Sequence, residues 1–424
     1  MRFIQGTSDA VKPMLDEVGI IALVPDIWEP QWQPRHQVLS RLARYFHVVW
    51  VNCPPLWRDS LSAFRSRAVA EKNGPPTPAG LEVYQPEFWL PRVGRPAWLA
   101  SFTSRQRLQR AAARLRAGGC TKLVLYIWRP GFADAIGHMP SALSIYHIDD
   151  EYSFSSTEKE ISPVERGLLQ SVGQVFIHSP ALMRKKSEFN AHTEFVPNGV
   201  DYRLYATSVP EPEDLRRIPH PRIGYVGWIK RVLDWDLLHK LSSTHPQWSF
   251  VFVGPTSPHP EINGMLQRMS ALPNVHFLGG KPTHSLGAYP QHFDVCTMPY
   301  RLDDYTKYIY PLKMHEYLAS GRPVVSAPIC SVEDFSHIIG IAGSPQEWSN
   351  AIEQALSEEE NSPARCSLRQ RVAREHDWEV LVDKIARTIS QRLGMNFPAA
   401  NFAGVDLQDI ELPGRSAFDV RGNS

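Results

Sequence analysis

The chain has 424 residues, of which 43% are hydrophobic and 21% charged, and its formal net charge at pH 7 is +1. At about 100–200 residues per domain, this length predicts two globular domains with ordinary apolar cores. The near-zero net charge creates no strong field for a polyanion, so we expect no nucleic acid partner.

The spacing of the cysteines and the length of the apolar stretches indicate the cellular compartment of the protein. Five cysteines lie far apart in the sequence and form no C-x-x-C pair. This arrangement indicates neither a zinc site nor a disulfide framework, and it fits a reducing compartment. The sequence has no stretch near the about 18–20 apolar residues of a membrane span, and its first residues lack the apolar core of a signal peptide. We therefore expect a cytoplasmic protein.

Short apolar runs alternate with helical patterns in the first half, which indicates a parallel β-sheet covered by helices. The predicted strands are Gly19–Val24, His47–Val51, Lys122–Ile127, Leu143–His147, Gln174–His178 and Thr193–Val196. Apolar residues at helical spacing predict a helix over Arg35–Tyr45.

The same pattern starts again after a polar segment that contains prolines. Further strands are predicted at Arg222–Val226, Ser249–Val253, Asn274–Leu278, Asp294–Met298 and Pro323–Ser326, with helices over Asp234–Ser242 and Pro311–Ser320. The predicted organisation is an α/β domain over 1–204, a linker over 205–220, a second α/β domain over 221–375, a last helix over 376–395 and a flexible tail over 396–424.

The segment Tyr308–Ser326 (YIYPLKMHEYLASGRPVVS) carries the strongest chemical signal. Pro311 suits the first turn of its predicted helix, and Gly321 is a natural stop. The free N–H groups at a helix N-terminus favour a diphosphate. Lys313 and Glu316 share a face of the helix, so they would offer a cation to phosphate and a carboxylate to ribose hydroxyls. The alternative is a solvated Lys–Glu pair on an ordinary helix.

Glycines and cations follow two of the predicted strands. Gly227 and Gly254 each come directly after a strand, where a glycine would let a ligand approach the backbone closely. Lys230 and Arg231 follow shortly and carry charges that suit phosphate. The alternatives are plain tight turns and solvated cations. The chain has neither GxxxxGK[ST] nor GxGxxG, so P-loop and ordinary dinucleotide-binding sites lack their signatures.

Acidic residues follow the predicted strand Leu143–His147. Asp149 and Asp150 should lie at its carboxyl end, where ligands bind in open α/β sheets. Either could take a proton from an attacking hydroxyl, and the alternative role is a helix N-cap. A second acidic group, Asp234–Trp235–Asp236, opens a predicted helix. We interpret Asp234 as the N-cap of that helix and expect no obligate metal.

Six segments of the chain, taken in order, resemble segments of GT-B glycosyltransferases. More narrowly, they resemble those of enzymes that build bacterial surface polysaccharides, such as the teichuronic-acid group. The resemblance spans roughly residues 19–390. The matching segments are W-x-x-R-H-Q (Trp32, Arg35, His36, Gln37), FVPNGVD (Phe195–Asp201), IGYVGWIK (Ile223–Lys230), Asn274–Tyr300, PLKMHEYLASGRPVVS (Pro311–Ser326) and Asp377–Trp378.

This resemblance implies a GT-B fold, with two Rossmann-like domains whose parallel sheets face a central cleft. It implies an acceptor on the first domain, a nucleotide-sugar, most simply a UDP-sugar, on the second, and a last helix that crosses back to the first. The expected activity is hexosyl transfer in polysaccharide biosynthesis, with no cofactor besides the nucleotide-sugar substrate. The expected donor-binding residues are Gly227, Lys230, Gly254, Tyr308, Pro311, Leu312, Lys313 and Glu316, with Asp149 or Asp150 as the catalytic carboxylate.

One position departs from the family pattern. Many retaining members carry a second glutamate eight positions before the glutamate that meets the ribose, and here that position is Tyr308. The donor sugar and the anomeric outcome therefore stay open. Two other functions on the same fold also stay open, a sugar-nucleotide epimerase and a non-catalytic partner protein.

The segment Phe88–Gly118 contains seven arginines and no Asp or Glu, with aromatic residues between them. Such a surface suits anionic lipid, so the acceptor would be a glycan or a lipid-linked sugar. The protein would then be peripheral on the inner face of the cell membrane. The alternative is a basic, solvated helix.

Overall fold

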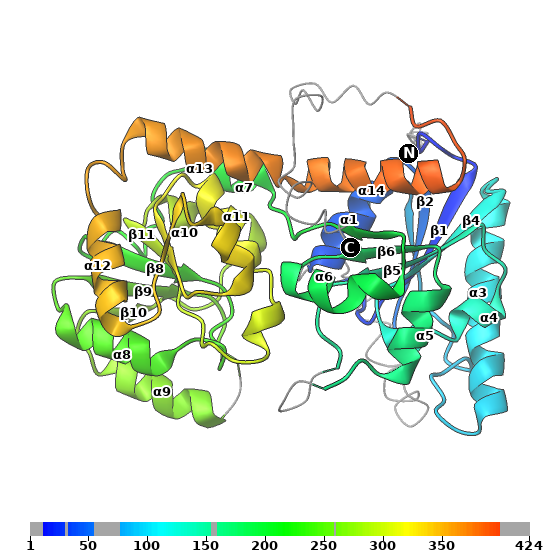
Figure 1. Ribbon diagram of the computed structural model, residues 1–424, viewed down its shortest axis with the longest axis horizontal. Coiled ribbons are helices and arrows are strands. Elements are labelled where there is room, and N and C mark those ends of the chain that lie inside the picture. The colour runs from blue at the N-terminus through cyan, green and yellow to red at the C-terminus, as the bar shows by residue number, and fades with distance from the viewer. Residues whose placement is uncertain (1–11, 30–32, 55–76, 154–158, 258–259, 399–424) are drawn as a thin grey trace, which may run out of the picture.

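The computed structural model describes residues 12–29, 33–54, 77–153, 159–257 and 260–398. They form two halves that lie side by side, each built on a parallel β-sheet with helices packed against it (Figure 1). Alternating strands and helices are the usual way to connect parallel strands, and this is the order that the sequence predicts. Trp32 and most of the predicted tail lie outside the described residues.

The first sheet has, within the described residues, seven parallel strands in the order β3-β2-β1-β4-β5-β6-β7. Its strands are β1 (Val18–Leu23), β2 (His47–Val51), β3 (Leu81–Tyr84), β4 (Lys122–Ile127), β5 (Leu143–Ile148), β6 (Gln174–Ile177) and β7 (Thr193–Phe195). The helices of this half are α1 (Pro34–Leu42), α3 (Ala97–Ala117), α4 (Ala135–His138), α5 (Pro163–Ser171) and α6 (Pro180–Lys186), with short turns η1 (Pro130–Phe132) and η2 (Ser187–Phe189). The edge strand β3 is not predicted because its short sequence, LEVY, is only partly apolar and only partly buried.

The second sheet has six parallel strands in the described residues, in the order β10-β9-β8-β11-β12-β13. They are β8 (Arg222–Val226), β9 (Ser249–Val253), β10 (Val275–Phe277), β11 (Val295–Met298), β12 (Val324–Ser326) and β13 (Ile339–Ile341). The other elements are α7 (Tyr202–Ala206), α8 (Trp235–Thr244), α9 (Pro260–Ser270), α10 (Ala288–Gln291), α11 (Leu312–Ala319), α12 (Pro345–Ala355), α13 (Pro363–Glu375), α14 (Trp378–Arg392), η3 (Thr283–Ser285), η4 (Thr306–Tyr308) and η5 (Cys330–Phe335).

The apolar core covers both faces of each sheet, as parallel sheets require. In the first half, one cluster packs under α1 and α14 and another packs under α3 and α5. This two-sided burial explains why most strands of that half read as continuous apolar runs. Across the part of the chain that is described, no helix has both the length and the apolar character needed to cross a membrane.

The chain crosses between the halves at two places that lie side by side. The N–H of Val200 donates to the carbonyl of His376 at 3.0 Å, and the N–H of Trp378 donates to the carbonyl of Val200 at 3.0 Å. A Cβ on Gly199 would lie 2.7 Å from the carbonyl oxygen of His376 and 2.8 Å from Cδ1 of Leu381, so only glycine allows this approach. After the second crossing, α14 packs on the core of the first half (Figure 1).

The segment 205–220, expected to link the halves, is packed into the second half. Tyr205, Leu215 and Ile218 belong to the core of that half. Arg222 donates to the carbonyls of Leu215 and Ile218, each at 2.8 Å. The change from one half to the other therefore falls near Val200.

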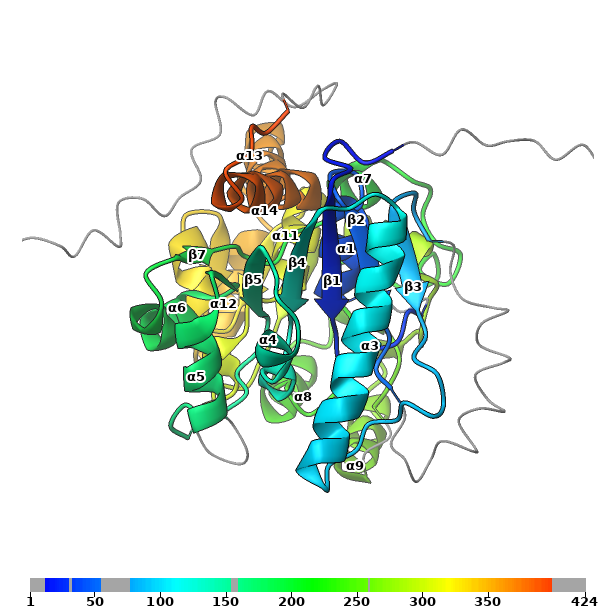
Figure 2. The same ribbon diagram turned by 90° about the vertical axis from the view of Figure 1, so that its right-hand side faces the viewer.

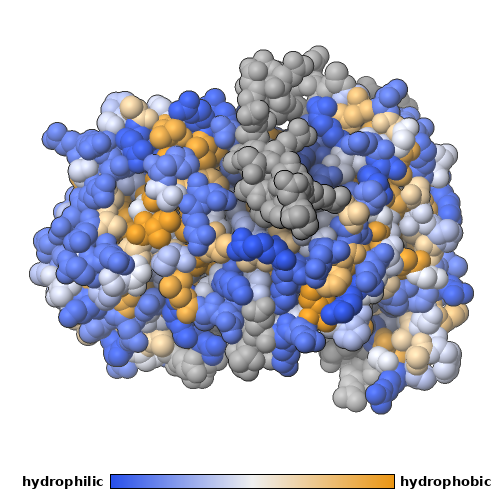
Figure 3. Space-filling view, viewed as in Figure 1, coloured by the Kyte–Doolittle hydropathy of each residue, from blue (hydrophilic) through white to orange (hydrophobic). Residues whose placement is uncertain are grey.

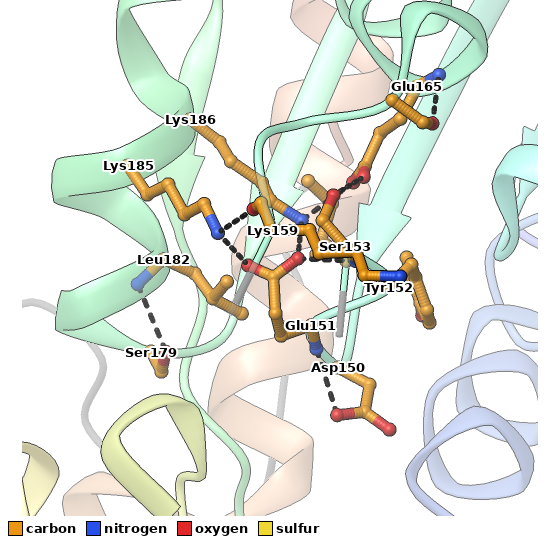
Figure 4. Close-up of polar contacts among 12 residues, drawn as sticks. Asp150, Glu151, Tyr152, Ser153, Lys159, Glu165, Ser179, Leu182, Lys185 and Lys186 are labelled. Carbon is orange, nitrogen blue, oxygen red and sulfur yellow. Dashed lines mark hydrogen bonds and ion pairs between the residues drawn. The ribbon is translucent and has the colours of Figure 1, made fainter. Parts of the chain in front are cut away.

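A buried ion cluster holds the loop that follows β5. Nζ of Lys186, a fully buried side chain, lies 2.7 Å from Oε1 of Glu165 and 3.3 Å from Oε1 of Glu151 (Figure 4). The same Glu151 oxygen accepts the N–H of Ser153 at 2.7 Å, and Nζ of Lys185 lies 3.2 Å from Oε2 of Glu151. Charge-assisted contacts therefore tie this loop to α5 and α6.

Replacing Lys186 with Met should leave two buried carboxylates without their shared cation. We expect the free energy of unfolding to fall by about 3–5 kcal/mol, measured by urea denaturation. A matched control is Asp236→Asn, which breaks an exposed pair with Arg268 at 3.1 Å. That control should change the free energy by less than about 1 kcal/mol. Equal losses in the two variants would contradict the role given to the buried cluster.

Several histidines lie in the interior as neutral rings. His36, His147, His178 and His376 are each at most 4% exposed. Burial lowers the pKa of His147 to about 3 and the pKa values of His178 and His376 to about 4. The ring of His147 stacks on Trp128 with 4.2 Å between centroids, which leaves no room for water on that face. The unfolded chain would protonate these rings near pH 6.5.

Stability should therefore depend on pH in a defined window. The contribution of the neutral rings is complete above about pH 6.5 and is lost as the pH falls toward 4, because the unfolded chain then binds protons that the folded chain does not. We expect the unfolding free energy to decrease over this window, and to decrease less in His178→Asn. An asparagine N–H can still donate to the carbonyl of Ile148, which lies 3.0 Å from Nδ1 of His178.

The difference between the two proteins isolates the histidine. Carboxyl groups whose pKa burial raises, such as Asp150 and Glu316, act in the opposite direction at low pH but are common to both proteins. Parallel curves of unfolding free energy against pH for the variant and the original chain would refute this account.

Candidate active site

Two glycines at strand ends of the second half make room for Lys313. Gly227 follows β8 with a φ of 145°, and Gly254 follows β9 with a φ of 148°, a conformation that favours glycine. A Cβ on Gly227 would lie 2.1 Å from Cε of Lys313, and a Cβ on Gly254 would lie 2.0 Å from the carbonyl oxygen of Gly227. The structure thus brings three of the predicted donor-binding residues together.

Lys313 places a cation near the N-terminus of α11. The helix begins one residue later than predicted, because Pro311 is extended and forms the N-cap rather than the first turn. Nζ of Lys313 lies 5.3 Å from the centroid of the Tyr225 ring. Burial lowers the pKa of Lys313, but electrostatic interactions with Tyr225, Tyr300 and Glu316 outweigh it and raise the pKa. The amine is therefore charged at neutral pH, at a helix end that favours anions.

Glu316 lies one turn further along the same helix and is half-buried. The hydroxyl of Tyr205, which comes from α7, lies close enough to the Glu316 carboxylate to influence its pKa. Burial raises the pKa of Glu316, while Lys313 and Tyr205 act against this rise. The carboxylate is thus held in a defined position, as a group that receives hydroxyl hydrogen bonds must be.

Lys230 and Asp150 connect the two halves across this site. Partial burial and the positive charge of Lys313 lower the pKa of Lys230, while the negative charge of Asp150 raises it. Lys230 lies in the loop after Gly227, and Asp150 lies in the loop after β5 of the other half. Because such interactions weaken rapidly with distance, Lys230 lies between the charge of Lys313 in its own half and the charge of Asp150 in the other half.

Asp149 is held as part of the scaffold. Its carboxylate pairs with Arg35 and accepts a hydrogen bond from the hydroxyl of Tyr152. Arg35 also donates from Nε to Oδ2 of Asp26 at 2.6 Å. Burial raises the pKa of Asp149, but Arg35, Arg129 and Tyr152 outweigh it and lower the pKa. A carboxylate with a lowered pKa and two fixed partners is a poor general base.

Asp150 has the environment that a general base needs. It is half-buried, and its Oδ1 accepts the N–H of Glu151 at 2.8 Å. Burial and the charge of Asp149 raise its pKa, which strengthens it as a proton acceptor. Its carboxylate points away from the ion cluster around Glu151 and Lys186 (Figure 4). Of the two predicted carboxylates, Asp150 is therefore the better candidate.

Arg129 is a charged residue of the site that the sequence motifs do not single out. It follows β4, and its guanidinium carbon lies 4.4 Å from the centroid of the Tyr152 ring. Its charge contributes to the lowered pKa of Asp149, and it opposes the rise that burial causes in the pKa values of Asp150 and Tyr305. Tyr305 belongs to the second half, so Arg129 lies near both halves. The signal that could have found it is its place just after a strand, at the sheet edge where ligands bind.

Three predicted donor-binding residues are placed in packing positions. Tyr308 is 3% exposed and belongs to a core cluster of the first half, with Nζ of Lys185 5.0 Å from its ring centroid. Leu312 packs against the core that includes α14, and Pro311 is buried at the N-cap. Large apolar side chains gain free energy from this burial. Their placement indicates that the side chains of Tyr308 and Leu312 join the two halves, which leaves only the backbone groups of these residues to meet a donor.

Asp234 caps α8, as predicted, because its Oδ1 accepts the N–H of Leu237 at 2.9 Å. Among the residues whose placement is described, no group of three or more His, Cys, Asp or Glu side chains is arranged to hold a metal ion. The positive charge of this site comes from Lys230, Lys313 and the N-terminus of α11.

Comparison with known proteins identifies the second half. Residues 220–358 match the family model described as glycosyl transferases group 1. The chain is similar to the putative teichuronic acid biosynthesis glycosyltransferase TuaH of Bacillus subtilis (strain 168), at 28% identity over 202 residues that cover 45% of this chain and 49% of that protein. The chain thus spans about half the length of the curated relative that it matches.

Solved structures resemble nearly the whole chain. The E. coli trehalose-6-phosphate structure bound with UDP-2-fluoro glucose has a TM-score of 0.63 at 13% identity, covering 89% of this chain and 99% of that one. A glycosyltransferase from Rickettsia africae ESF-5 has a TM-score of 0.62 at 10% identity, covering 89% and 98%. At these identities the likeness concerns the fold, and it confirms the two Rossmann-like domains that the sequence predicts. Residues 220–358 are therefore a glycosyl transferases group 1 domain, within a chain that has the GT-B fold.

Proposed function

We propose that this protein is a glycosyltransferase that moves a sugar from a nucleotide-sugar to an acceptor hydroxyl. The observation that carries the proposal is that Lys230 experiences both the charge of Lys313, which a bare backbone at Gly227 accommodates, and the charge of Asp150 from the other half. Two cations suit a leaving diphosphate, and a carboxylate of raised pKa suits an acceptor hydroxyl. The group 1 domain and the GT-B fold support the same class of reaction.

The donor in this proposal is a UDP-sugar. Its diphosphate would lie at the N-terminus of α11, against the bare backbone of Gly227 and Gly254, with Lys313 and Lys230 as cations. Glu316, positioned by Tyr205, would accept hydrogen bonds from the ribose hydroxyls. The similar E. coli structure is bound with UDP-2-fluoro glucose, which supports uridine as the nucleoside.

The proposed chemistry is a direct displacement at the anomeric carbon. Asp150 takes the proton of the acceptor hydroxyl while its oxygen bonds to that carbon and the bond to the diphosphate breaks. Negative charge then grows on the diphosphate, where the two lysines are already in place to stabilise it. Such a displacement inverts the anomeric configuration.

The acceptor is proposed to be a glycan or a lipid-linked sugar of bacterial polysaccharide synthesis, and the transferred group a hexose. The support is the similarity to TuaH, a protein named for teichuronic acid biosynthesis. The transfer needs no metal ion in this proposal, because the two lysines and the helix N-terminus supply the positive charge.

The donor site can be tested by calorimetric titration with UDP, GDP and ADP. We expect micromolar binding of UDP, weakened roughly 10–100-fold in Lys313→Ala and in Glu316→Ala, because each loses a charge-assisted contact. Lys240→Ala, an exposed lysine on α8, is the control and should bind like the original chain. If the original chain binds none of the three nucleotides, or if Lys313→Ala binds UDP unchanged, the donor site is wrong as drawn.

The assignment of the base can be tested by comparing Asp150→Asn with Asp149→Asn. UDP release from a panel of UDP-hexoses with extracted lipid-linked glycans as acceptors should show a 10²–10⁴-fold lower kcat for Asp150→Asn, at unchanged UDP affinity. Asp149→Asn should mainly lower the thermal midpoint, because it breaks the pair with Arg35. An unchanged kcat in Asp150→Asn would remove it as the base, and conversion of the donor without any acceptor would indicate an epimerase.

A further inference from the structure

The segment between β3 and the second turn of α3 exposes an unusual set of aromatic rings. Phe88, Trp89, Trp98 and Phe102 are between 49% and 71% exposed. Figure 3 shows a face of the molecule on which hydrophilic residues predominate and apolar residues form small patches. Four large rings within fifteen positions of the sequence exceed the scattered apolar residues of an ordinary surface. We call these four residues the aromatic tip.

Positive charge without an acidic partner among the described residues surrounds the aromatic tip. Arg92, Arg95 and Arg105 are exposed, and the sequence has no acidic residue between Phe88 and Gly118. Two arginines further along α3 are instead paired, Arg110 with Glu87 at 2.5 Å and Arg114 with Glu82 at 2.6 Å. The charge near the tip is therefore available to an external anion, whereas the charge further along the helix is partly neutralised.

The aromatic tip is built as a rigid surface. Trp98, Phe102 and Arg105 lie at positions i, i+4 and i+7 of α3, so they share one face of the helix. Nη1 of Arg107 donates to the carbonyls of Leu90 and Pro91 at 3.0 and 2.9 Å, which ties the preceding loop to the helix. Rings on a fixed backbone lose little further entropy when they meet a second surface.

The aromatic tip lies at the edge of the sheet that carries the site. Because α3 joins the parallel strands β3 and β4, it runs antiparallel to them, and its first turn lies at their carboxyl edge. Figure 2 shows α3 beside β1, with one helix end at the edge toward which the arrows of β1 and β4 point. Asp150 follows β5 at the same edge. A pocket of about 110 Å³ opens beside α3, lined by residues that include Arg92, Ala100 and Ser104.

We propose that the aromatic tip docks on the surface of a lipid bilayer that contains anionic phospholipids. Trp and Phe rings insert at the level of the headgroups, and neighbouring arginines meet the lipid phosphates with their apolar stems lying along the membrane. A protein partner would have to supply acidic groups among apolar ones, whereas an anionic bilayer offers both over its whole surface. This inference does not depend on the proposed transfer reaction, and it would present the sheet edge with Asp150 toward substrates held in the membrane.

The test is co-sedimentation of the full chain with vesicles of phosphatidylcholine alone and with 30% phosphatidylglycerol. The original chain should bind the anionic vesicles, and more weakly at 0.5 M salt, because salt screens the charges. Trp98→Ser with Phe102→Ser should weaken binding by at least tenfold, and Arg95→Gln with Arg105→Gln by about tenfold. The control Val164→Ser changes an apolar residue of α5 that is 57% exposed and should bind like the original chain.

Two outcomes would overturn the proposal. One is equal vesicle binding, or none, for the original chain and the tip variants. The other is a dimer, seen by light scattering, that the tip substitutions dissociate, because the aromatic tip would then be an interface between copies. Calorimetric titration of UDP on the same samples separates this test from that of the donor site, since the tip variants should bind UDP as the original chain does.

Discussion

Backbone hydrogen bonds between Val200 and the segment 376–378 determine where the two halves of this chain meet. Both crossings of the chain pass through this one point, and Gly199 allows them to approach to van der Waals distance. The position of one sheet relative to the other is therefore set close to the ends of the strands. Loops that follow β5 and β8 can then face each other, although they are distant in sequence. The electrostatic interaction between Asp150 and Lys230 follows from this pivot, by which we mean the paired chain crossings at Val200 and 376–378.

Around that pivot, buried charges are used to fix loops rather than to add stability. Removing Lys186, Glu151 and Glu165 from water costs free energy that their mutual attraction only offsets. The same holds for Asp149 and Arg35. Both groups lie beside the loop that carries Asp150 and leave it little freedom. Because the loop is fixed, the Asp150 carboxylate keeps both its orientation and the surroundings that raise its pKa. A flexible loop would preserve neither.

The sequence predicted the sheets well because their strands are buried on both faces and read as continuous apolar runs. It missed β3 and β13, which are short edge strands with weaker patterns. In the candidate site, the position of Lys313 near a helix N-terminus was predictable from the sequence. Tyr308 and Leu312 lie in the same segment, yet they pack against the first half. No local pattern could reveal this, because their partners lie more than a hundred residues earlier or on α14.

The same limit applies to the acidic pair. Asp149 and Asp150 are adjacent in sequence and equally acidic in water, so their spacing cannot rank them. The structure separates them by their neighbours, Arg35 and Tyr152 for one and a backbone N–H for the other. The roles proposed for Arg129 and Tyr205 depend on contacts between segments that are far apart in the sequence.

The burial of Tyr308 among residues of the first half has a mechanical meaning for the molecule. A ring at 3% exposure cannot leave that position without returning its apolar surface to water, at about 25 cal/mol for each Å². The halves therefore resist being pulled straight apart at this contact, whereas a rotation that keeps the ring buried carries no such penalty. In the proposed reaction, substrates would therefore enter and leave by a rotation of one half relative to the other. The axis of this rotation would pass through the buried Tyr308 ring and the paired crossings at Val200 and His376.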